Sequence, residues 1–572
     1  MLSITYNTSY NMNTRSVLSS FAVLSCCTAV GQVQKKDEPQ RPNIIYIMCD
    51  DHAFQCISAY GSPVSQLAPT PNIDRIARQG MRFDRAFVEN SLSTPSRACL
   101  ITGMYSHQNG QKQLSEGIDT TLTFFSEMLH DAGYQTALIG KWHIDCEPKG
   151  FDYYHIYNDQ GQYYNPQYRG NDTGNKFIVE EGYSTDLSTD HAIDFLEHRD
   201  ASNPFCLLLH HKAPHRNWLA DTKFLGMYDN VEFPVPETFY DDYKTRGSAA
   251  RTQKMSILKD MRWEQDFKVP EMLDMDNIDS KDSYNGLMGE INRMTPEQRA
   301  AWGRYYFPRN RKLLEADLSG KELDNWKYQS YIRDYMSVIH SVDLSVGRIL
   351  DYLEEHGLAD NTVVIYTSDQ GFYMGEHGWF DKRFMYEESF RTPLIVSYPG
   401  HIKPGSVCSK LIQNIDYAPT FLALAGIDKP EYMPGRSLLP VFEHGDEVKP
   451  WRKSIYYHYY DYPTYHMVRK HDGVRTDRYK LIHFFGKGGL DAVQENKYQG
   501  IDGTNENSTL KYLMSIDYFS PEDKDIDYYE LYDLEADPHE LNNVYGKPGY
   551  EKITRQLLKE LSSYRQQLES DE

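Results

Sequence analysis

The stretch Asn43–Cys49, NIIYIMC, is apolar from its second residue on, and it stops abruptly at Asp50 and Asp51. Three other short apolar runs also end directly in polar side chains: TVVIYT at 362–367, TALI at 136–139 and FCLLL at 205–209. Unalternated runs of this length are typical of strands buried on both faces of a parallel sheet. Open α/β sheets bind their ligands beyond the carboxyl ends of the strands. We therefore expect one composite site where these four runs end.

The residues after the other three runs are chemically capable side chains. They form the segments SDQG at 368–371, GKWH at 140–143 and HHKAPH at 210–215. With the two aspartates they would bring carboxylates, lysines and histidines to one edge of the sheet. This combination indicates an active site.

A fifth segment, STPSRACLITG at 93–103, predicts a short helix. Pro95 fits the first turn, Thr94 is a natural cap before it, and Gly103 marks the end. Ser93 would then lie just ahead of the positive end of the helix dipole, with Arg97 one turn further on. That arrangement favours an anionic group beside Ser93. The alternative is a capped helix with a surface arginine.

The composition excludes one class of partner. The chain has 572 residues, and 60 Lys and Arg stand against 82 Asp and Glu, for a net charge of −22. Nucleic-acid binding is therefore not expected, and an anionic substrate must be held by a local cluster of cations. The six cysteines after residue 40 lack CxxC spacing and are expected to be buried free thiols.

The first residues resemble an export signal. Arg15 gives a short basic start, and the apolar stretch 17–30 is too short to span a membrane. We expect a signal peptide over 1–31, while Cys26 and Cys27 leave a lipoprotein signal open. The protein would then be periplasmic, or a cell-surface lipoprotein, in a bacterium, without a stable membrane span.

The rest of the chain shows two different sequence patterns, and its length suggests more than one structural unit. From 41 to about 450, apolar runs alternate with helical patterns at 72–77, 124–129 and 335–353, which predicts a doubly wound α/β domain. Residues 217–330 are poor in apolar runs and predict a polar, largely helical insertion. This insertion would either shape the rim of the pocket or be a solvent-exposed segment without a function. From 451 to 572 we expect a smaller α+β subdomain with an antiparallel sheet and a closing helix.

Taken together, these segments resemble the formylglycine-dependent sulfatase family, in its serine-type branch. The resemblance covers nearly the whole chain after residue 40 and rests on RPNII at 41–45 with the aspartate pair, STPSR at 93–97, GKWH at 140–143, PH at 214–215, SDQG at 368–371, DK at 381–382, IDYAPT at 415–420, and ELYDL at 530–534 with DP at 537–538. It implies an alkaline-phosphatase-like fold, with a doubly wound mixed sheet and the smaller C-terminal subdomain.

The resemblance also implies the reactive group and its metal. A radical-type maturing enzyme, a transient partner, would oxidise Ser93 to formylglycine (3-oxoalanine), whose hydrate attacks sulfur and then expels sulfate. One Ca²⁺ ion would be held by Ser93 and by Asp50, Asp51, Asp369 and Gln370. These side chains supply only oxygen ligands, which suit calcium better than zinc. Gln370 stands where the family more often has asparagine or histidine.

The remaining catalytic roles follow from the same resemblance. Arg97, Lys141 and Lys382 would neutralise the sulfate and the charge that develops on it. His143 would accept a proton from the hydrated formylglycine, and His215, with Lys382, would protonate the leaving alcohol. Taken singly, each of these residues is more often a salt-bridge partner or a structural histidine.

Sugar recognition must come from residues around the leaving group. Asp381 and Arg383 flank the candidate lysine and are expected to clamp vicinal hydroxyls. His466 and His471, from the second subdomain, are candidates to overhang the same pocket or, alternatively, strand-surface residues.

Two segments indicate which sulfated sugar is the substrate. HKAPHRNW at 211–218 and FDKRF at 380–384 are most similar to those of bacterial N-acetylglucosamine-6-sulfatases. The resemblance implies an exo-acting enzyme that removes the 6-O-sulfate of terminal N-acetylglucosamine or glucosamine in host glycans of heparan or heparin, mucin or keratan type.

Three alternatives stay open at this point. The enzyme could act on sulfated galactose or N-acetylgalactosamine instead. A phosphatase or phosphonate hydrolase on the same sheet would need a two-zinc site with several histidines, whereas the expected ligands here are oxygen donors. A glycan-binding protein without catalysis would not need the full set of catalytic side chains.

Overall fold

A computed structural model describes residues 41–114, 117–273, 275–276, 278–495 and 519–568. The signal peptide predicted over 1–31 lies outside these residues. Among the helices described, none is both long enough and apolar enough to cross a membrane.

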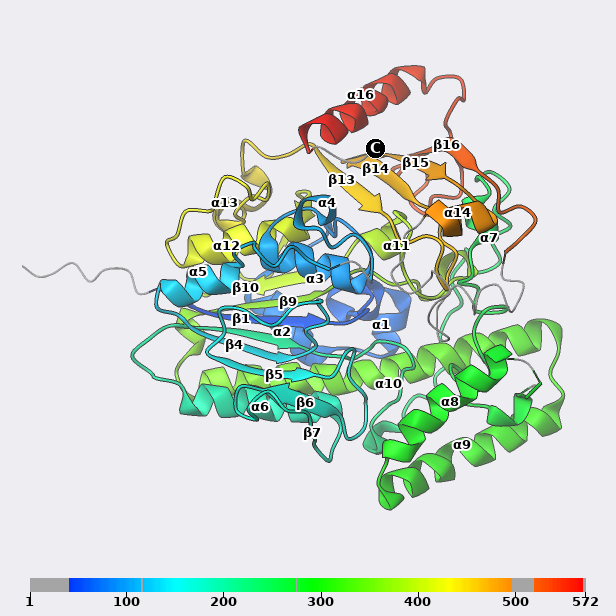
Figure 1. Ribbon diagram of the computed structural model, residues 1–572, viewed down its shortest axis with the longest axis horizontal. Helices are drawn as coiled ribbons and strands as arrows, with labels where there is room; N and C mark the ends of the chain where they lie inside the picture. Colours follow the sequence, from blue (N-terminus) through cyan, green and yellow to red (C-terminus); the bar gives the residue numbers. More distant parts are fainter. Residues whose placement is uncertain (1–40, 115–116, 274, 277, 496–518, 569–572) are drawn as a thin grey trace, which may run out of the picture. The chain divides into compact units, whose positions relative to one another are not determined.

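The four apolar runs are central strands of a ten-stranded sheet (Figure 1). β1 (Asn43–Cys49) lies between β9 (Thr362–Ser368) and β8 (Phe205–His210), and β4 (Gln135–Gly140) pairs with β8 on its other side. All these pairs are parallel, and β1, β8 and β9 are buried throughout. The prediction of parallel strands covered on both faces is confirmed.

The outer strands make the sheet mixed. On one side β10 (Leu394–Ser397) is antiparallel to both β9 and β2 (Met81–Phe83), and β11 (Ser406–Cys408) pairs parallel with β2. On the other side β5 (Tyr153–Tyr157) extends the parallel run, and β6 (Gln167–Gly170) and β7 (Ile178–Val179) add antiparallel strands.

Successive residues of β1 face two different layers of helices, which Figure 1 shows above and below the strands. Ile45 and Ile47 pack in one core, with α2 (Pro71–Gln79), α6 (Ser184–His198) and α10 (Gly320–Glu355). Ile44 and Tyr46 pack in another, with α3 (Ser93–Thr102), α5 (Phe125–Asp131) and α12 (Tyr417–Leu424). This is the predicted doubly wound α/β architecture, and the helical patterns fall on α2, α5 and α10.

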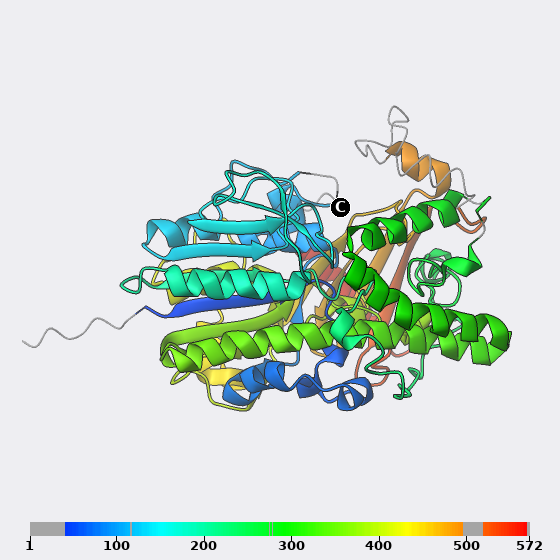
Figure 2. The same ribbon diagram turned by 90° about the horizontal axis from the view of Figure 1, so that it is seen from below.

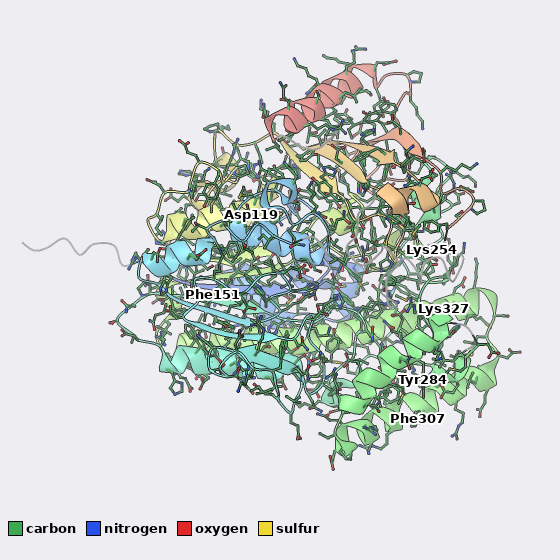
Figure 3. All side chains as sticks on the ribbon, in the orientation of Figure 1. Asp119, Phe151, Lys254, Tyr284, Phe307 and Lys327 are labelled. Atoms are coloured by element: carbon green, nitrogen blue, oxygen red, sulfur yellow. The ribbon has the colours of Figure 1, made fainter. Side chains whose placement is uncertain are left out.

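The segment 217–330 is helical only in its second half. There α8 (Ile278–Arg293) and α9 (Pro296–Ala316) lead into α10, and Phe307 projects from α9 into solvent (Figure 3). The first half holds only short helical turns, the longest being α7 (Ala249–Thr252). Phe233 and Phe239 from this half are buried in the same core as α10, so the segment packs on the domain.

A second, antiparallel sheet follows, in the order β13 (Ser454–Tyr459), β14 (His471–Thr476), β15 (Tyr479–Gly486) and β16 (Ile526–Asp533). On one face, Leu557 and Leu561 of α16 (Glu551–Gln567) pack against it. On the other face lie Trp379 and Phe384. The second sheet therefore supports the loop that contains the candidate residues 381–383.

Several further elements are short. They are α1 (Pro63–Leu67), α4 (Ser106–Asn109), α11 (Glu387–Phe390), α13 (Leu439–His444), α14 (Gly489–Glu495) and a small parallel pair formed by β3 (Ala86–Phe87) and β12 (Ile412–Gln413). The cysteines of the described residues are free, and all but Cys146 are buried, as expected for packed thiols.

Candidate active site

Ser93 is the first residue of α3 and faces the ends of β1 and β9. Gly103 ends the helix in a left-handed conformation with φ 66°, as predicted. The predicted cap at Thr94 is wrong, because the N-cap is Leu92 and no side chain caps the helix. Thr94 lies inside the first turn, where its hydroxyl faces His143 Nδ1 at 3.4 Å.

Three buried carboxylates converge beside Ser93. Its Oγ donates to Asp50 Oδ1 at 3.2 Å, and the backbone N–H of Asp51 donates to Asp369 Oδ1 at 3.1 Å. The sheet register explains the convergence, since Cys49 pairs with Ser368 and the chain leaves both strands at the same level. Asp51 makes the turn with φ 70°, in the left-handed region that a non-glycine residue seldom adopts.

Three buried cations face these carboxylates. Lys141 Nζ donates a hydrogen bond to Asp50. Arg97 donates two hydrogen bonds to Asp369 Oδ2, from Nε at 3.1 Å and from Nη2 at 3.0 Å. Lys382 Nζ bonds Asp51 and lies 3.4 Å from Ser93 Oγ. Three carboxyl groups and three basic side chains therefore surround the serine.

Burial sets the protonation of this cluster. It raises the pKa of Asp51 to about 7. The nearby charges of Asp50 and Asp369 also raise this pKa, whereas the positive charge of Lys382 lowers it. Burial also lowers the pKa of Lys141 to about 8, against the attraction of Asp50. Burial would raise the pKa of Asp50 too, but Lys141 and the other cations hold that pKa well below its usual range. The carboxylates would therefore gain from a further positive charge.

Gln370 offers a buried oxygen at the same place. Its Nε2 donates to Asp51 Oδ1, and its Oε1 has no hydrogen-bond partner within the described part of the chain. A turn of the amide would direct an oxygen toward the carboxylates. Such a set of oxygen donors suits a hard divalent cation, and side-chain ligand atoms of Asp50, Asp51 and His215 also lie within 4.8 Å of one another.

Two histidines border the cluster. His215 Nε2 lies 3.8 Å from Asp51 Oδ2, and its Nδ1 donates to the Arg216 carbonyl at 2.7 Å. His143 Nε2 lies 3.6 Å from Asp159 Oδ1. Burial holds the pKa of both rings well below the usual value, so both are neutral at pH 7 and can accept a proton.

Asp381, Arg383 and His466 form a second group next to Lys382. Asp381 Oδ1 accepts from Arg383 Nε at 2.9 Å, and Asp381 Oδ2 lies 3.3 Å from His466 Nε2. His466 Nδ1 donates to the carbonyl of Lys254, a residue of the insertion labelled in Figure 3. Asp381 and Arg383 have φ of 71° and 99°, a strained backbone of the kind found at functional sites.

His471 is placed differently from the other candidates. It is fully buried in β14, its Nε2 accepts from the Met385 N–H at 3.0 Å, and its Nδ1 donates to the Arg469 carbonyl at 2.8 Å. Both nitrogens serve the backbone, so the ring positions the 380–386 loop and leaves no nitrogen for a ligand. The sequence shows only a histidine near a strand, which does not reveal this bonding.

Sequence reasoning missed several supporting residues. Arg383 Nη1 donates to Tyr459 Oη and Asp461 Oδ2, both at 3.1 Å, so the second sheet holds this arginine. Lys141 Nζ lies 3.4 Å from Gln160 Oε1. Asn414 Nδ2 donates to Ser96 Oγ at 3.1 Å in the first turn of α3. Only Asn414 had a signal, because it directly precedes the matched segment at 415–420.

Comparison with known proteins decides the family. The family model described as "Sulfatase" matches residues 42–427, and the one described as "N-sulphoglucosamine sulphohydrolase, C-terminal" matches 375–497 and 509–567. The chain belongs to the sulfatase family. It is a sulfuric ester hydrolase, and the predicted resemblance and the alkaline-phosphatase-like mixed sheet are confirmed.

Individual sulfatases match over nearly their full lengths. The chain is 43% identical to the N-acetylglucosamine-6-O-sulfatase of Bacteroides thetaiotaomicron over 567 residues, covering 98% of this chain and 92% of the relative. It is 25% identical to the human N-acetylglucosamine-6-sulfatase, with 88% and 81% covered. A solved structure in complex with its substrate D-glucosamine-2-N,6-O-disulfate superposes with a TM-score of 0.81 at 43% identity, covering 93% of this chain and 99% of the other.

Proposed function

We propose that this sulfatase is exo-acting and hydrolyses the 6-O-sulfate of terminal N-acetylglucosamine or glucosamine in glycans of heparan or heparin, mucin or keratan type. The main support is the 43% identity, over almost the whole of both chains, to a bacterial N-acetylglucosamine-6-O-sulfatase. The leader expected over 1–31 would export it to the periplasm or, with a lipid anchor, to the cell surface.

Ser93 is the residue to be activated. Its maturation by a radical-type enzyme to formylglycine would supply, once hydrated, one hydroxyl that attacks sulfur and a second that releases sulfate. The contacts of the unmodified side chain support this role, because Asp50 Oδ1 lies 3.2 Å and Lys382 Nζ 3.4 Å from its Oγ. Asp50, which stays ionised beside Lys141, is placed to accept a hydrogen bond from a hydroxyl there, and Lys382 to stabilise negative charge on it.

Asp50, Asp51, Asp369 and Gln370, with the modified Ser93, would hold one Ca²⁺ ion. The ion would polarise a sulfate oxygen and favour the ionised nucleophile. The charges of the site support this proposal. The three buried carboxylates are already paired with Arg97, Lys141 and Lys382, so an added divalent cation would give the site a net positive charge. A positive, buried site favours a sulfate ester over a neutral ligand.

Three side chains would move or hold protons. Burial lowers the pKa of Lys382, but Asp51 and Asp381 more than compensate, so that pKa is raised and the side chain stays cationic against the sulfate. His215 is neutral in the free protein, and an anion beside it would raise its pKa. It would thus gain a proton with the substrate and give it to the leaving alcohol, while neutral His143 would accept one from the nucleophile.

Asp381, Arg383 and His466 would bind the hydroxyls of the terminal sugar. They adjoin Lys382, and the acid and the guanidinium already share a hydrogen bond of 2.9 Å that would hold both in a fixed orientation. A carboxylate beside an arginine offers acceptors and donors to two neighbouring hydroxyls. His471 has no part in this proposal.

A panel of sulfated monosaccharides tests the function. Protein co-produced with a maturing enzyme is offered the 6-sulfates of glucosamine, N-acetylglucosamine, galactose and N-acetylgalactosamine, together with 3- and 4-sulfated isomers. We expect sulfate release from the two glucosamine 6-sulfates. Exclusive release from galactose-configured sugars would overturn the sugar assignment and leave the sulfatase intact.

A further inference from the structure

A second group of metal-ligating side chains lies away from the candidate active site. His155 is in the middle of β5, Glu180 directly follows β7, and His191 is on α6. Both ribbon views place α6 beside these edge strands (Figures 1 and 2). His155 pairs in register with Ile139, whose side chain packs in the same core as Ala192 of α6, so the group lies on a face of the sheet and not beyond its strand ends.

The two imidazoles converge on a single carboxylate. His155 Nε2 lies 2.7 Å from Glu180 Oε1, and His191 Nε2 lies 2.7 Å from Glu180 Oε2. The ring centroids are only 3.9 Å apart, and the ligand atoms all lie within 4.8 Å of one another. The His155 side chain is 1% exposed, whereas His191 and Glu180 are 22% and 20% exposed, so the group is held from inside and open on one side.

A second carboxylate fixes the buried ring. His155 Nδ1 lies 3.3 Å from Asp172 Oδ1, and a carboxylate can only accept the Nδ1 hydrogen. Histidines that bind a metal through Nε2 commonly donate Nδ1–H to such an outer carboxylate. Glu180 also only accepts, so the space between its oxygens and the two Nε2 atoms must contain either protons or a cation.

We propose that His155, His191 and Glu180 bind one Zn²⁺ ion, with Asp172 orienting His155. Two imidazole nitrogens and a carboxylate are a usual zinc ligand set, and the exposed side leaves room for a water as fourth ligand. With tetrahedral bonds of about 2.0–2.1 Å, neighbouring ligand atoms lie about 3.3 Å apart, so each Nε2–Oε contact of 2.7 Å would widen by about 0.6 Å when the ion binds. The ion would fasten the end of the β6–β7 hairpin to α6.

Zinc titration of the full-length protein tests this site. Metal is first removed with a chelator, and Zn²⁺ is then added in excess Ca²⁺, which occupies oxygen-donor sites, while calorimetry records stoichiometry and Kd. We expect one saturable zinc site in the wild type, its loss in His191→Gln, and a Kd about 10- to 100-fold weaker in Asp172→Asn. His198→Gln is the matched control, because His198 forms an exposed group with Asp194 and Glu197 on the same helix, and its loss should leave zinc binding unchanged.

Two further readouts keep the test decisive. Co²⁺ should give the intense visible absorption of a tetrahedral site in the wild type and not in His191→Gln or Glu180→Gln. Zinc should raise the melting temperature of the wild type and of His198→Gln, but not of His191→Gln, while sulfate release stays unchanged in every folded variant. Equal zinc stoichiometry and Kd in wild type and His191→Gln, or no zinc bound by the wild type, would overturn the proposal.

Discussion

The half of the candidate site that we propose for the sulfate and the half that we propose for the sugar are built in different ways. Asp50, Asp369 and Lys141 directly follow parallel strands of the central sheet. The β1–β9 ladder fixes the separation of the two aspartates, and the ladders of β8 with β1 and β4 place the lysine. Asp381 and Arg383 lie on a loop, and Tyr459 and Asp461 near the second sheet hold the arginine. The first half depends on the core of the main domain, and the second on how the second sheet packs on the loop.

This difference suggests how one fold serves many sulfated substrates. Charges that contact the sulfate must be placed to within tenths of an ångström, and adjacent strand ends achieve this. The loop that we propose for the sugar can change without disturbing the central ladder. We therefore expect substitutions in the first half to abolish turnover on every sulfate ester, and those in the second half to act selectively on sugars.

The largest effect is expected at Ser93. Ser93→Ala removes the side chain that would be oxidised, so sulfate release from sugar and aryl esters alike should fall to background. Peptide mass spectrometry of the wild type should show a loss of about two hydrogens at Ser93, the change that the oxidation itself requires. The matched control is Ser93→Cys, which should regain activity where a cysteine-type maturing enzyme is present. An unmodified serine in fully active protein would contradict the account.

The second effect concerns the cation. Asp369→Ala removes one buried carboxylate, the one that accepts two hydrogen bonds from Arg97, so we expect loss of bound calcium and about two to three decades of turnover. The loss should be equal for sugar and aryl sulfates, because both use the same sulfate pocket. Metal analysis and kcat on both substrates measure it. Turnover at the wild-type level in excess chelator would refute the calcium assignment.

The third effect should separate the two halves. Arg383→Ala removes charged hydrogen bonds from a buried pocket, which corresponds to about 2–5 kcal/mol in kcat/KM on N-acetylglucosamine 6-sulfate. A compact aryl sulfate makes no such contacts and should be much less affected. Tyr459→Phe is the milder control, since it removes one support of the arginine and keeps the guanidinium. Equal losses on both substrates would show that the arginine acts on sulfate and not on sugar.

The smallest effect on turnover is expected at His471, because this residue should change the pH dependence of folding stability instead. Burial lowers the pKa of its ring from the ordinary 6.5 to about 4. At pH values between these two, the unfolded chain binds a proton on this ring and the folded chain does not. Stability is then lost as the pH falls from about 6.5 toward 4, and the histidine accounts for about 2 kcal/mol between pH 7 and 5. Urea unfolding at both pH values should show His471→Gln losing less stability than the wild type. The same pH dependence in both proteins would contradict this assignment.

The two halves also differ in how far the sequence predicts them. Strands such as Asn43–Cys49 are continuous apolar runs that end in charged residues, so both the sheet and the place of Asp50 and Asp51 follow from local pattern. Thr94 was misplaced because a buried helix is held by tertiary contacts and does not need the side-chain cap that its sequence offers.

Contacts between distant segments are what the sequence does not show. The bonds of His471 to Met385 and Arg469, and of Arg383 to Tyr459, depend on how the second sheet packs on the loop. The group of His155, Glu180 and His191 was missed for the same reason, since its residues come from a strand, the end of a hairpin and a helix, without motif spacing.

The most direct test of the central claim is a comparison of kcat/KM for N-acetylglucosamine 6-sulfate and galactose 6-sulfate with protein whose Ser93 is shown by mass spectrometry to be formylglycine. The account predicts efficient sulfate release from the first sugar, little from the second, and loss of that preference in Arg383→Ala. Release from galactose 6-sulfate alone, or equal activity of preparations with and without the modified residue, would contradict it.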